Sequence, residues 1–221
     1  MTVEINSKPR LTERFNDALV FTASLHNKQT RKGPLEVPYI SHLLGVASLV
    51  LEADGDEDMA IAALLHDAVE DQGGYETLDR IRAKFGERVA HIVEGCTDDF
   101  SGHGRISWCE RKTKYIAHLR EETDEETRIV SLADKVHNAR AILLDYIEAG
   151  DAVFTRFRAR KEGTVWYYRT LVDAFRYAET KRPIMHFKRG HERLLRELDR
   201  LVDKLEKRTN IDGRSVNPCR G

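Results

Sequence analysis

Apolar residues recur at intervals of three and four along most of the chain, for example between residues 11 and 19 and between residues 43 and 51. This spacing places apolar side chains on one face of an α-helix, and no alternating strand pattern of comparable length is present. The same pattern and helix-end signals predict further helices. We place them at about residues 56–71, 75–84, 87–96, 108–121, 125–149, 159–180 and 186–206.

The breaks between the predicted helices contain residues typical of turns. Gly and Pro occur at 32–38, Gly at 72–74, 85–86 and 101–104, and each segment is short enough to join helices within one domain. A chain of 221 residues also suits one domain better than two. We therefore predict an all-α, single-domain helical bundle over residues 11–206, with an N-terminal extension at 1–10 and a polar, flexible tail at 207–221.

Composition narrows the classes of protein. Apolar residues make up 41% and charged residues 33% of the chain, with a formal net charge of −1, which disfavours nucleic-acid partners. The apolar stretch 59–65 is too short to cross a bilayer, and residues 1–10 lack the apolar centre of a secretion signal. We therefore expect a cytoplasmic protein without a membrane partner. Three cysteines without CxxC spacing argue against a disulfide framework and a thiolate zinc site.

The segment from His66 to Asp71 concentrates groups that can bind a metal or move a proton. It follows the apolar run 61–65, and residues four apart share a helical face, so Glu70 lies above His66 and Asp71 above Asp67. A divalent cation would relieve the repulsion among the carboxylates, with His66 and Asp67 as ligands. Glu70 and Asp71 would then remain for proton transfer. The alternative is a solvated acidic helix end.

Two other segments offer further ligands. His42 follows Pro38 at the start of a predicted helix and can point outward from that turn; the alternative is a capping or surface histidine. Asp134 lies in a helix with an apolar start, where a buried carboxylate is costly unless it binds a metal or a cation. Its alternative is a salt bridge to Lys or Arg. Asn138, one turn later, faces the same side as Asp134, whereas Lys135 and His137 point to the flanks.

The ordered pattern of His42, His66-Asp67 and Asp134 resembles the HD superfamily of metal-dependent phosphohydrolases. Residues 66–71 and 132–140 more closely resemble the hydrolase domain of RelA/SpoT-type enzymes and the small alarmone hydrolases. The resemblance covers about residues 15–174. It implies an HD-type helical bundle that removes pyrophosphate from the 3′ position of (p)ppGpp. No segment resembles the synthetase domain of the long RelA/SpoT proteins, so we expect hydrolysis without synthesis.

The resemblance also implies roles for individual residues. It assigns water activation to Glu70 and Asp71, and a divalent metal, usually Mn²⁺, to His42, His66, Asp67 and Asp134. The donor types alone would equally suit iron, cobalt or zinc. The implied substrate contacts are Arg31, Lys32, Lys112, Asn138, Lys161 and Tyr167. For Arg31 and Lys32 the alternative is a pair of solvated loop charges, and for Asn138 it is an ordinary amide on a helix surface.

The chain departs from the family pattern at several positions. Ala68 and Gln72 stand where bacterial hydrolases often carry Thr, and Leu43 stands where they often carry Pro. The loop 100–107 is this chain's own, and residues 166–169 supply bulky aromatic side chains that could reshape the pocket. The nearest alternative function is therefore an HD phosphohydrolase for another nucleotide or phosphoester. A catalytically silent helical module is a second alternative, which Glu70 and Asp71 disfavour. As a partner we expect a small-molecule nucleotide substrate, and a homo-oligomer is compatible with the sequence.

Overall fold

The computed structural model describes residues 11–33, 35–98 and 107–219, and within these ranges it is helical, without a β-strand. The predicted extension at 1–10 and most of the loop 100–107 lie outside the described residues. The all-α fold is confirmed. The helices are α1 Glu13–Leu25, α2 Ile40–Glu52, α3 Glu57–Leu65, α4 Ala68–Asp71, α5 Gly74–Phe85, α6 Glu87–Cys96, α7 Trp108–Glu121, α8 Glu125–Ala149, the 3-10 helix η1 Gly150–Arg156, α9 Arg160–Lys181 and α10 Lys188–Thr209.

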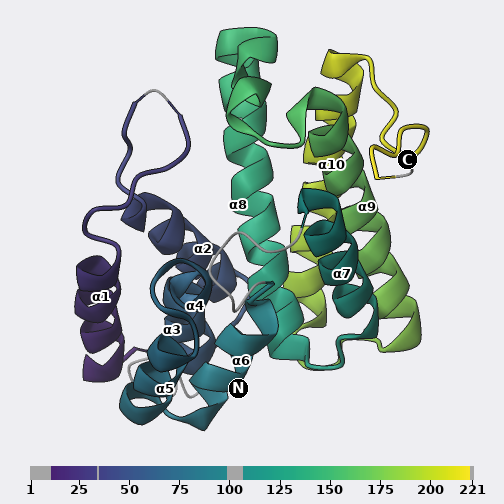
Figure 1. The fold of residues 1–221 in the computed structure, drawn as a ribbon. Coiled ribbons are helices and arrows are strands. Elements are labelled where there is room, and N and C mark those ends of the chain that lie inside the picture. The colour runs from purple at the N-terminus through teal and green to yellow at the C-terminus, as the bar shows by residue number, and fades with distance from the viewer. Residues whose placement is uncertain (1–10, 34, 99–106, 220–221) are drawn as a thin grey trace, which may run out of the picture.

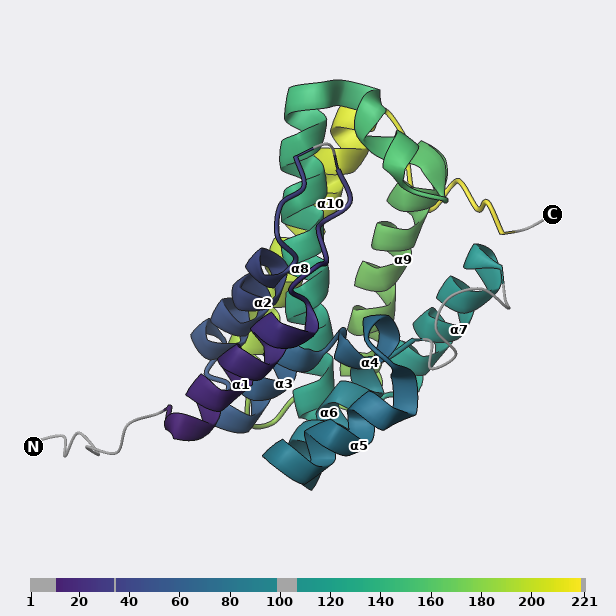
Figure 2. The ribbon, with the colours of Figure 1, turned by 60° about the vertical axis from the view of Figure 1, so that its left-hand side comes forward.

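The long helix α8 stands in the middle of the molecule. Helices α1 to α6 lie on one side of it, and α7, α9 and α10 lie on the other (Figures 1 and 2). The half of α8 from Thr127 to Val136 is almost entirely buried, whereas Leu144 and Ile147 near its C-terminal end are exposed. The buried half carries Asp134, so the fold brings that carboxylate between the two groups of helices.

Local sequence signals explain where the helices begin. Thr12, Asp56, Ser107 and Asp124 precede α1, α3, α7 and α8, and each side chain accepts a hydrogen bond from a backbone N–H of the first turn. Such caps satisfy donors that have no partner within the helix. Helix α3 is different, because every residue from Met59 to Leu65 is completely buried. A helix that is apolar on every face is typical of a buried core element. Helix α3 is such an element, and it ends directly before His66.

The prediction of one helix over residues 56–71 is wrong. Helix α3 ends at Leu65, and the short helix α4 begins only at Ala68. His66 and Asp67 form the turn between them. Periodicity could not reveal this break, because the residues on both sides of it are buried on all faces. The turn places the adjacent imidazole and carboxylate at a helix end, where both can approach other elements.

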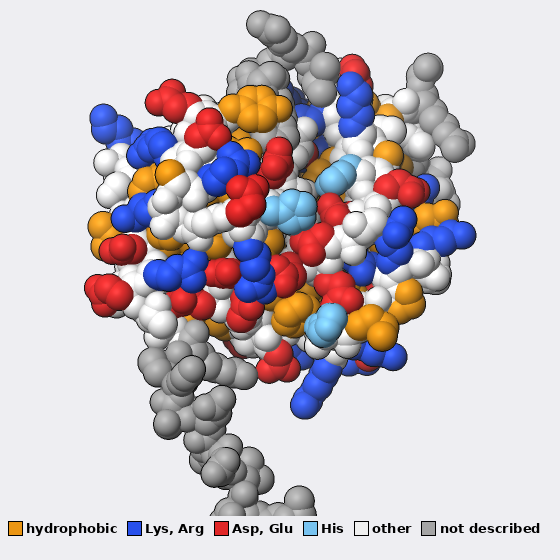
Figure 3. Space-filling view, turned by 90° about the horizontal axis from the view of Figure 1, so that it is seen from below, with side chains coloured by type: hydrophobic (Ala, Val, Ile, Leu, Met, Phe, Trp, Pro, Cys, Tyr) orange, Lys and Arg blue, Asp and Glu red, His pale blue; other side chains and the backbone are white. Residues whose placement is uncertain are grey.

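The surface carries charges of both signs, as expected from the nearly balanced composition. On the face seen in Figure 3, Lys and Arg side chains lie beside Asp and Glu side chains. Ion pairs such as Arg88–Glu126, at 2.6 Å, join neighbouring helices. Among the described helices, none has the combination of length and apolar character that crossing a bilayer requires.

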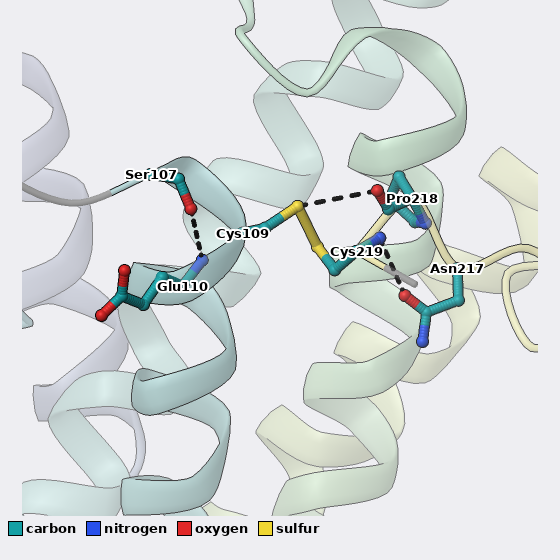
Figure 4. Close-up of a disulfide and its surroundings, with 6 residues drawn as sticks. All are labelled: Ser107, Cys109, Glu110, Asn217, Pro218 and Cys219. Atoms are coloured by element: carbon teal, nitrogen blue, oxygen red, sulfur yellow. Dashed lines mark hydrogen bonds between the residues drawn. A yellow bond between two sulfur atoms is a disulfide. The ribbon is translucent and has the colours of Figure 1, made fainter. Parts of the chain in front are cut away.

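The C-terminal segment is folded against the bundle, in contrast to the flexible tail expected from residue 207 onward. Helix α10 extends to Thr209, and Ile211, Val216 and Cys219 pack against the core. Cys219 forms a disulfide with Cys109 at the start of α7, with a Cα–Cα distance of 5.4 Å (Figure 4). The expectation of no disulfide is therefore wrong. The two cysteines are 110 residues apart, so only the tertiary fold shows that they meet.

Candidate metal centre and active site

Three helical elements bring together a compact group of metal-binding side chains. His42 comes from α2, His66 follows α3, and Asp134 comes from α8; one ligand atom of each lies within 4.8 Å of the others. All three side chains are buried, and His42 is completely so. The expectation that His42 points outward is therefore wrong. It lies in the first turn of α2, and its ring contacts His137 and Asp134 of α8 instead of solvent.

Asp67 adjoins this group from the turn after α3. Its Oδ2 atom lies 3.1 Å from Nε2 of His66 and 3.5 Å from Nε2 of His42. The hydroxyl of Tyr39 donates a hydrogen bond of 2.5 Å to the same oxygen. Oδ1 of Asp134 lies 3.2 Å from Nε2 of His42 and 3.7 Å from Nε2 of His66. Both carboxylates thus lie close to both imidazoles.

The hydrogen bonds of the two imidazoles fit a bound cation. Nδ1 of His66 lies 2.8 Å from the carbonyl oxygen of Ala63, so it carries the proton and donates. Nε2 of His66 then presents a lone pair. The Nε2 atoms of His42 and His66 are both buried without a hydrogen-bond partner among the described residues. Neutral imidazole nitrogens beside carboxylate oxygens are typical ligands of divalent transition metals. The four residues therefore fit such an ion.

The pKa shifts of His66 and Asp134 also fit a bound cation. Burial alone would lower the pKa of His66, but the carboxylates of Asp67 and Asp134 raise it well above its usual range. Burial would raise the pKa of Asp134, but Lys135 and the two histidines hold it well below its usual range. The carboxylates therefore stay ionised and attract positive charge. A divalent cation would supply that charge without protonating the histidines.

The two acids proposed for proton transfer lie beside the metal ligands. Asp71 accepts a hydrogen bond of 2.7 Å from Nε2 of Gln29. Glu70 accepts one of 2.9 Å from Arg111, which also donates to Asp98 at 2.7 Å. Burial, and then the negative charge of Asp98, raise the pKa of Glu70 to about 8. A carboxyl group that titrates near neutral pH can both accept and release a proton.

A cavity of about 910 Å³ opens over the metal-binding group. His66, Asp67, Glu70, Asp71 and Asp134 line one part of it. The remaining wall is rich in cationic and aromatic side chains, which suits a negatively charged ligand with a ring system. These residues include Arg31, Lys32, Tyr39, Trp108, Arg111, Lys112, Lys135, Arg156, Arg158, Tyr167 and Tyr168.

The structure brings five of the six predicted substrate contacts to this cavity: Arg31, Lys32, Lys112, Asn138 and Tyr167. Arg31 donates a hydrogen bond of 2.6 Å to Asn138, whose amide donates in turn to Asp134 at 2.5 Å. Nζ of Lys112 pairs with the carboxylate of Asp98 at 2.6 Å and lies over the ring of Tyr167. The cationic wall and the metal ligands are thus directly linked.

Lys161, the sixth predicted contact, is absent from the residues that line this cavity. It lies in the first turn of α9, and its Nζ atom pairs with Asp151 of η1 at 2.9 Å. The segment between α8 and α9 is this 3-10 helix, Gly150–Arg156. The structure therefore gives Lys161 a contact with Asp151 in place of phosphate.

Several residues near the site had no assigned role in the sequence analysis. Tyr39 stands three residues before His42, and Arg111 stands directly before Lys112, so their proximity to these candidate residues was the available signal. Asp98 follows the predicted helix 87–96 in the same way. His137 was placed on a flank of its helix, yet its Nδ1 lies 2.9 Å from Nδ1 of His42. Burial, and then His42 and Arg31, lower the pKa of His137 to about 4.

Several proteins of known sequence resemble this chain. It is 40% identical over 126 residues to the guanosine-3′,5′-bis(diphosphate) 3′-pyrophosphohydrolase MESH1 of Xenopus tropicalis, and 37% identical over 126 residues to human MESH1. Each alignment covers 56% of this chain and 66% of the relative, slightly less than two thirds of its length. The Aquifex aeolicus enzyme of the same name is 35% identical over 136 residues, covering 61% of this chain and 18% of that protein.

Solved structures agree with these relationships. A metazoan ortholog of SpoT, described as hydrolysing ppGpp, superposes with a TM-score of 0.65 and 25% identity, covering 86% of this chain and 97% of the other. The lmo0812 protein of Listeria monocytogenes superposes with a TM-score of 0.56 and 29% identity, covering 70% and 96%. The HD domain family model matches residues 18–165, which include every residue of the His-His-Asp cluster. The fold, the divalent metal site and this match agree, and the chain belongs to the HD domain family.

Proposed function

We propose that this protein is a metal-dependent phosphohydrolase that removes pyrophosphate from the 3′ position of (p)ppGpp, with Mn²⁺ as its metal. One observation carries the proposal: a single cavity is lined by His66 and Asp134 of the His-His-Asp cluster, by Asp67, by the two acids and by a cationic wall. Relatives named for this reaction support the choice of substrate.

In the proposed reaction, a water oxygen forms a bond to the phosphorus nearest the ribose, and the bond from that phosphorus to the 3′ oxygen breaks. Pyrophosphate leaves, and the 3′ oxygen takes up a proton. A metal held by His42, His66, Asp67 and Asp134 would lower the pKa of water and neutralise phosphate charge. Glu70 and Asp71, one turn from the ligand Asp67, are placed to accept and relay the proton of the attacking water.

The hydrogen bonds around Glu70 and Asp71 hold both acids toward the cavity. Gln29 fixes one oxygen of Asp71, and Arg111 fixes Glu70 against Asp98. Because Arg111 and Lys112 are already paired with carboxylates, an incoming phosphate must compete for them. That competition would weaken the ion pair between Arg111 and Glu70 when substrate binds, which suits an acid that needs to exchange protons.

The nucleoside end of the substrate is assigned to Arg31 and Asn138. Their direct hydrogen bond, and the further bond from Asn138 to Asp134, set this part of the wall at a defined distance from the metal ligands. Arg31 also lies over the ring of Tyr39, 5.6 Å from its centroid. A planar guanidinium held in this way can stack on a purine and attract phosphate.

A comparison of substrates tests the proposal. Purified protein, stripped of metal and reloaded with Mn²⁺, is incubated with ppGpp, pppGpp, GTP, GDP and NADPH, and the released pyrophosphate and phosphate are quantified. We expect pyrophosphate release from (p)ppGpp to exceed release from every other compound. Preferential hydrolysis of another compound would support the alternative HD phosphohydrolase. No hydrolysis of any compound, with metal bound, would support a catalytically silent module.

A further inference from the structure

His42 is held by a second histidine that is not itself part of the metal-binding group. Nδ1 of His42 lies 2.9 Å from Nδ1 of His137, and the two ring centroids are 4.8 Å apart. At this distance one nitrogen carries the proton and the other accepts it. Because the contact joins α2 to α8, it also couples the ligand His42 to the helix that supplies Asp134.

The opposite nitrogen of His42 decides the direction of this hydrogen bond. Nε2 is buried and has no hydrogen-bond partner among the described residues, and it faces oxygens of Asp134 at 3.2 Å and Asp67 at 3.5 Å. A metal ligand must present a lone pair there. A neutral imidazole carries one proton, so that proton lies on Nδ1. His42 therefore donates, and His137 accepts.

The sequence of α2 provides the space that this arrangement needs. A Cβ atom added at Gly45 would lie 2.3 Å from both Cδ2 and Nε2 of His137. Real side chains do not tolerate such a distance, and the ring on the other side is a rigid group. Gly45 is thus required for the close approach of His137 to α2, independently of any need for an unusual backbone conformation.

The two ligand imidazoles differ in how they are oriented. His66 donates from Nδ1 to a backbone carbonyl, that of Ala63, whereas the acceptor for His42 is a side chain. We propose that His137 is a positioning residue for the metal site: it fixes the ring and tautomer of His42, and Gly45 gives it room. This inference rests on the proposed metal site and extends it to two residues that do not touch the metal.

Acceptors that orient ligand histidines tune metal binding substantially, and their loss typically weakens metal affinity by about 10–100-fold. We expect His137→Leu, which keeps apolar bulk but removes the acceptor, to weaken Mn²⁺ and Zn²⁺ binding by about that factor. His137→Asn places an amide oxygen near the position of Nδ1. It should restore affinity to within a few fold of the parent protein, which a role in packing alone would not explain.

Gly45→Ala disturbs the same contact from α2, because the added Cβ would displace the ring of His137. It should also weaken metal binding. If both substitutions act through one hydrogen bond, the double variant Gly45→Ala/His137→Leu loses no more affinity than the weaker-binding single variant. Exposed His91 on α6 provides the control, and His91→Leu should bind metal like the parent. Thermal unfolding of each metal-free variant establishes that the compared proteins are folded.

Two measurements on the metal-stripped full chain test the proposal without using activity. Isothermal titration with Mn²⁺ and with Zn²⁺ gives the affinities, and ¹H–¹⁵N correlation spectra of the Zn²⁺-loaded protein identify which nitrogen of His42 carries a proton. We expect protonated Nδ1 in the parent and in His137→Asn. Equal affinity of folded His137→Leu and parent, or a proton on Nε2 of His42, would overturn the inference. Absence of metal binding by the parent would instead overturn the proposed metal site.

Discussion

Two clusters of charged residues, each built around buried side chains, differ in how their polar atoms are satisfied. In the first, Arg169 of α9 is only 2% exposed, yet its guanidinium contacts three acids of α10. Nη1 lies 2.9 Å from Asp199, and Nη2 lies 2.5 Å from both Asp203 and Glu206. The three carboxylates therefore compensate the positive charge of Arg169.

The second cluster is the metal-binding group, in which two buried nitrogen atoms of the described residues lack a hydrogen-bond partner. The Nε2 atoms of His42 and His66 have no hydrogen-bond partner among the residues described, although both lie beside carboxylates. A buried polar atom without a partner costs about 1–3 kcal/mol, and this cost disappears if the atoms share a cation. The comparison shows that burial of charge does not identify a site. Two buried imidazole nitrogens that lack a hydrogen-bond partner in the described part of the chain and lie beside carboxylate oxygens do indicate a metal site.

The two clusters also differ in how the sequence encodes them. The acids around Arg169 recur at 199, 203 and 206, on one face of one helix, and serve to join α10 to α9. The metal-binding group draws residues from the consecutive helices α2 and α3 and from α8, which comes much later in the chain, at Glu125–Ala149. Only the second arrangement depends on the whole fold, which suits a site whose geometry must hold an ion.

The largest effect is expected from removing a metal ligand. Asp67→Ala takes away the oxygen that faces both histidines, so the protein should lose its bound metal and its hydrolysis of (p)ppGpp should fall to background. Chelation of the parent should do the same, and Mn²⁺ should reverse it. Metal content is measured by elemental analysis. Asp79→Ala, at a highly exposed carboxylate of α5, is the control; retention of metal by Asp67→Ala would remove it from the ligand set.

Substitution of the acids should separate chemistry from metal binding. Glu70→Gln with Asp71→Asn keeps the shapes and removes the groups that accept protons, so metal content should stay normal while kcat falls by about 10²–10⁴-fold. Steady-state kinetics with metal analysis of the same samples measures both. Unchanged kcat would exclude the two acids from proton transfer.

The raised pKa of Glu70 gives this prediction a second readout in the metal-free protein. An acid whose pKa is about 8 when folded and about 4.5 when unfolded binds more protons in the folded state between these values. Its contribution to stability is therefore fully present below pH 4.5 and is lost as the pH rises toward 8. Urea unfolding across this range should show a decline that is smaller in Glu70→Gln. Parallel curves for the two proteins would contradict the raised pKa.

The amino-acid pattern predicts several helices with the bounds that the structure shows, and α7 and α8 among them begin after a capping side chain. The predicted ranges 87–96, 108–121 and 125–149 coincide with α6, α7 and α8. It fails at the turn of His66 and Asp67, because burial on all sides erases the periodicity that would mark a helix end. In the same way, the contact between His137 and His42 and the disulfide of Cys109 depend on packing between elements, which no local pattern records.

A substitution in the cluster around Arg169 should lower stability without changing metal binding. Arg169→Met leaves Asp199, Asp203 and Glu206 without their shared partner, and we expect a loss of about 2–3 kcal/mol in the free energy of unfolding. This is less than for a fully buried pair, because Asp203 is half exposed. Urea unfolding of the metal-free protein measures it. Arg176→Met removes a more exposed arginine that contacts the same acid, Asp199, and should cost under about 1 kcal/mol.

A substitution on the cationic wall should weaken substrate use without releasing metal. Arg31→Ala removes the hydrogen bond to Asn138 and a charged contact to the nucleoside. Since such a contact contributes about 1.5–3 kcal/mol, kcat/KM should fall by roughly ten- to more than a hundredfold. Arg193→Ala, at an exposed arginine of α10, is the control. If Arg31→Ala and Asn138→Ala both retain the parent kcat/KM for (p)ppGpp, the assignment of the nucleoside end is wrong.

The smallest effect is expected at Lys161, where the family pattern and the structure give different roles. The pattern implies a phosphate contact, which would make Lys161→Ala as damaging as Arg31→Ala. In the structure, the side chain pairs with Asp151, whose carboxylate is 64% exposed, and pairs of this kind contribute about 0.2–1 kcal/mol to stability. We therefore expect Lys161→Ala to keep the parent kcat/KM and to lose at most about 1 kcal/mol of stability. A tenfold or larger fall in kcat/KM for (p)ppGpp, with metal retained, would show that the pair with Asp151 opens and that Lys161 reaches the substrate.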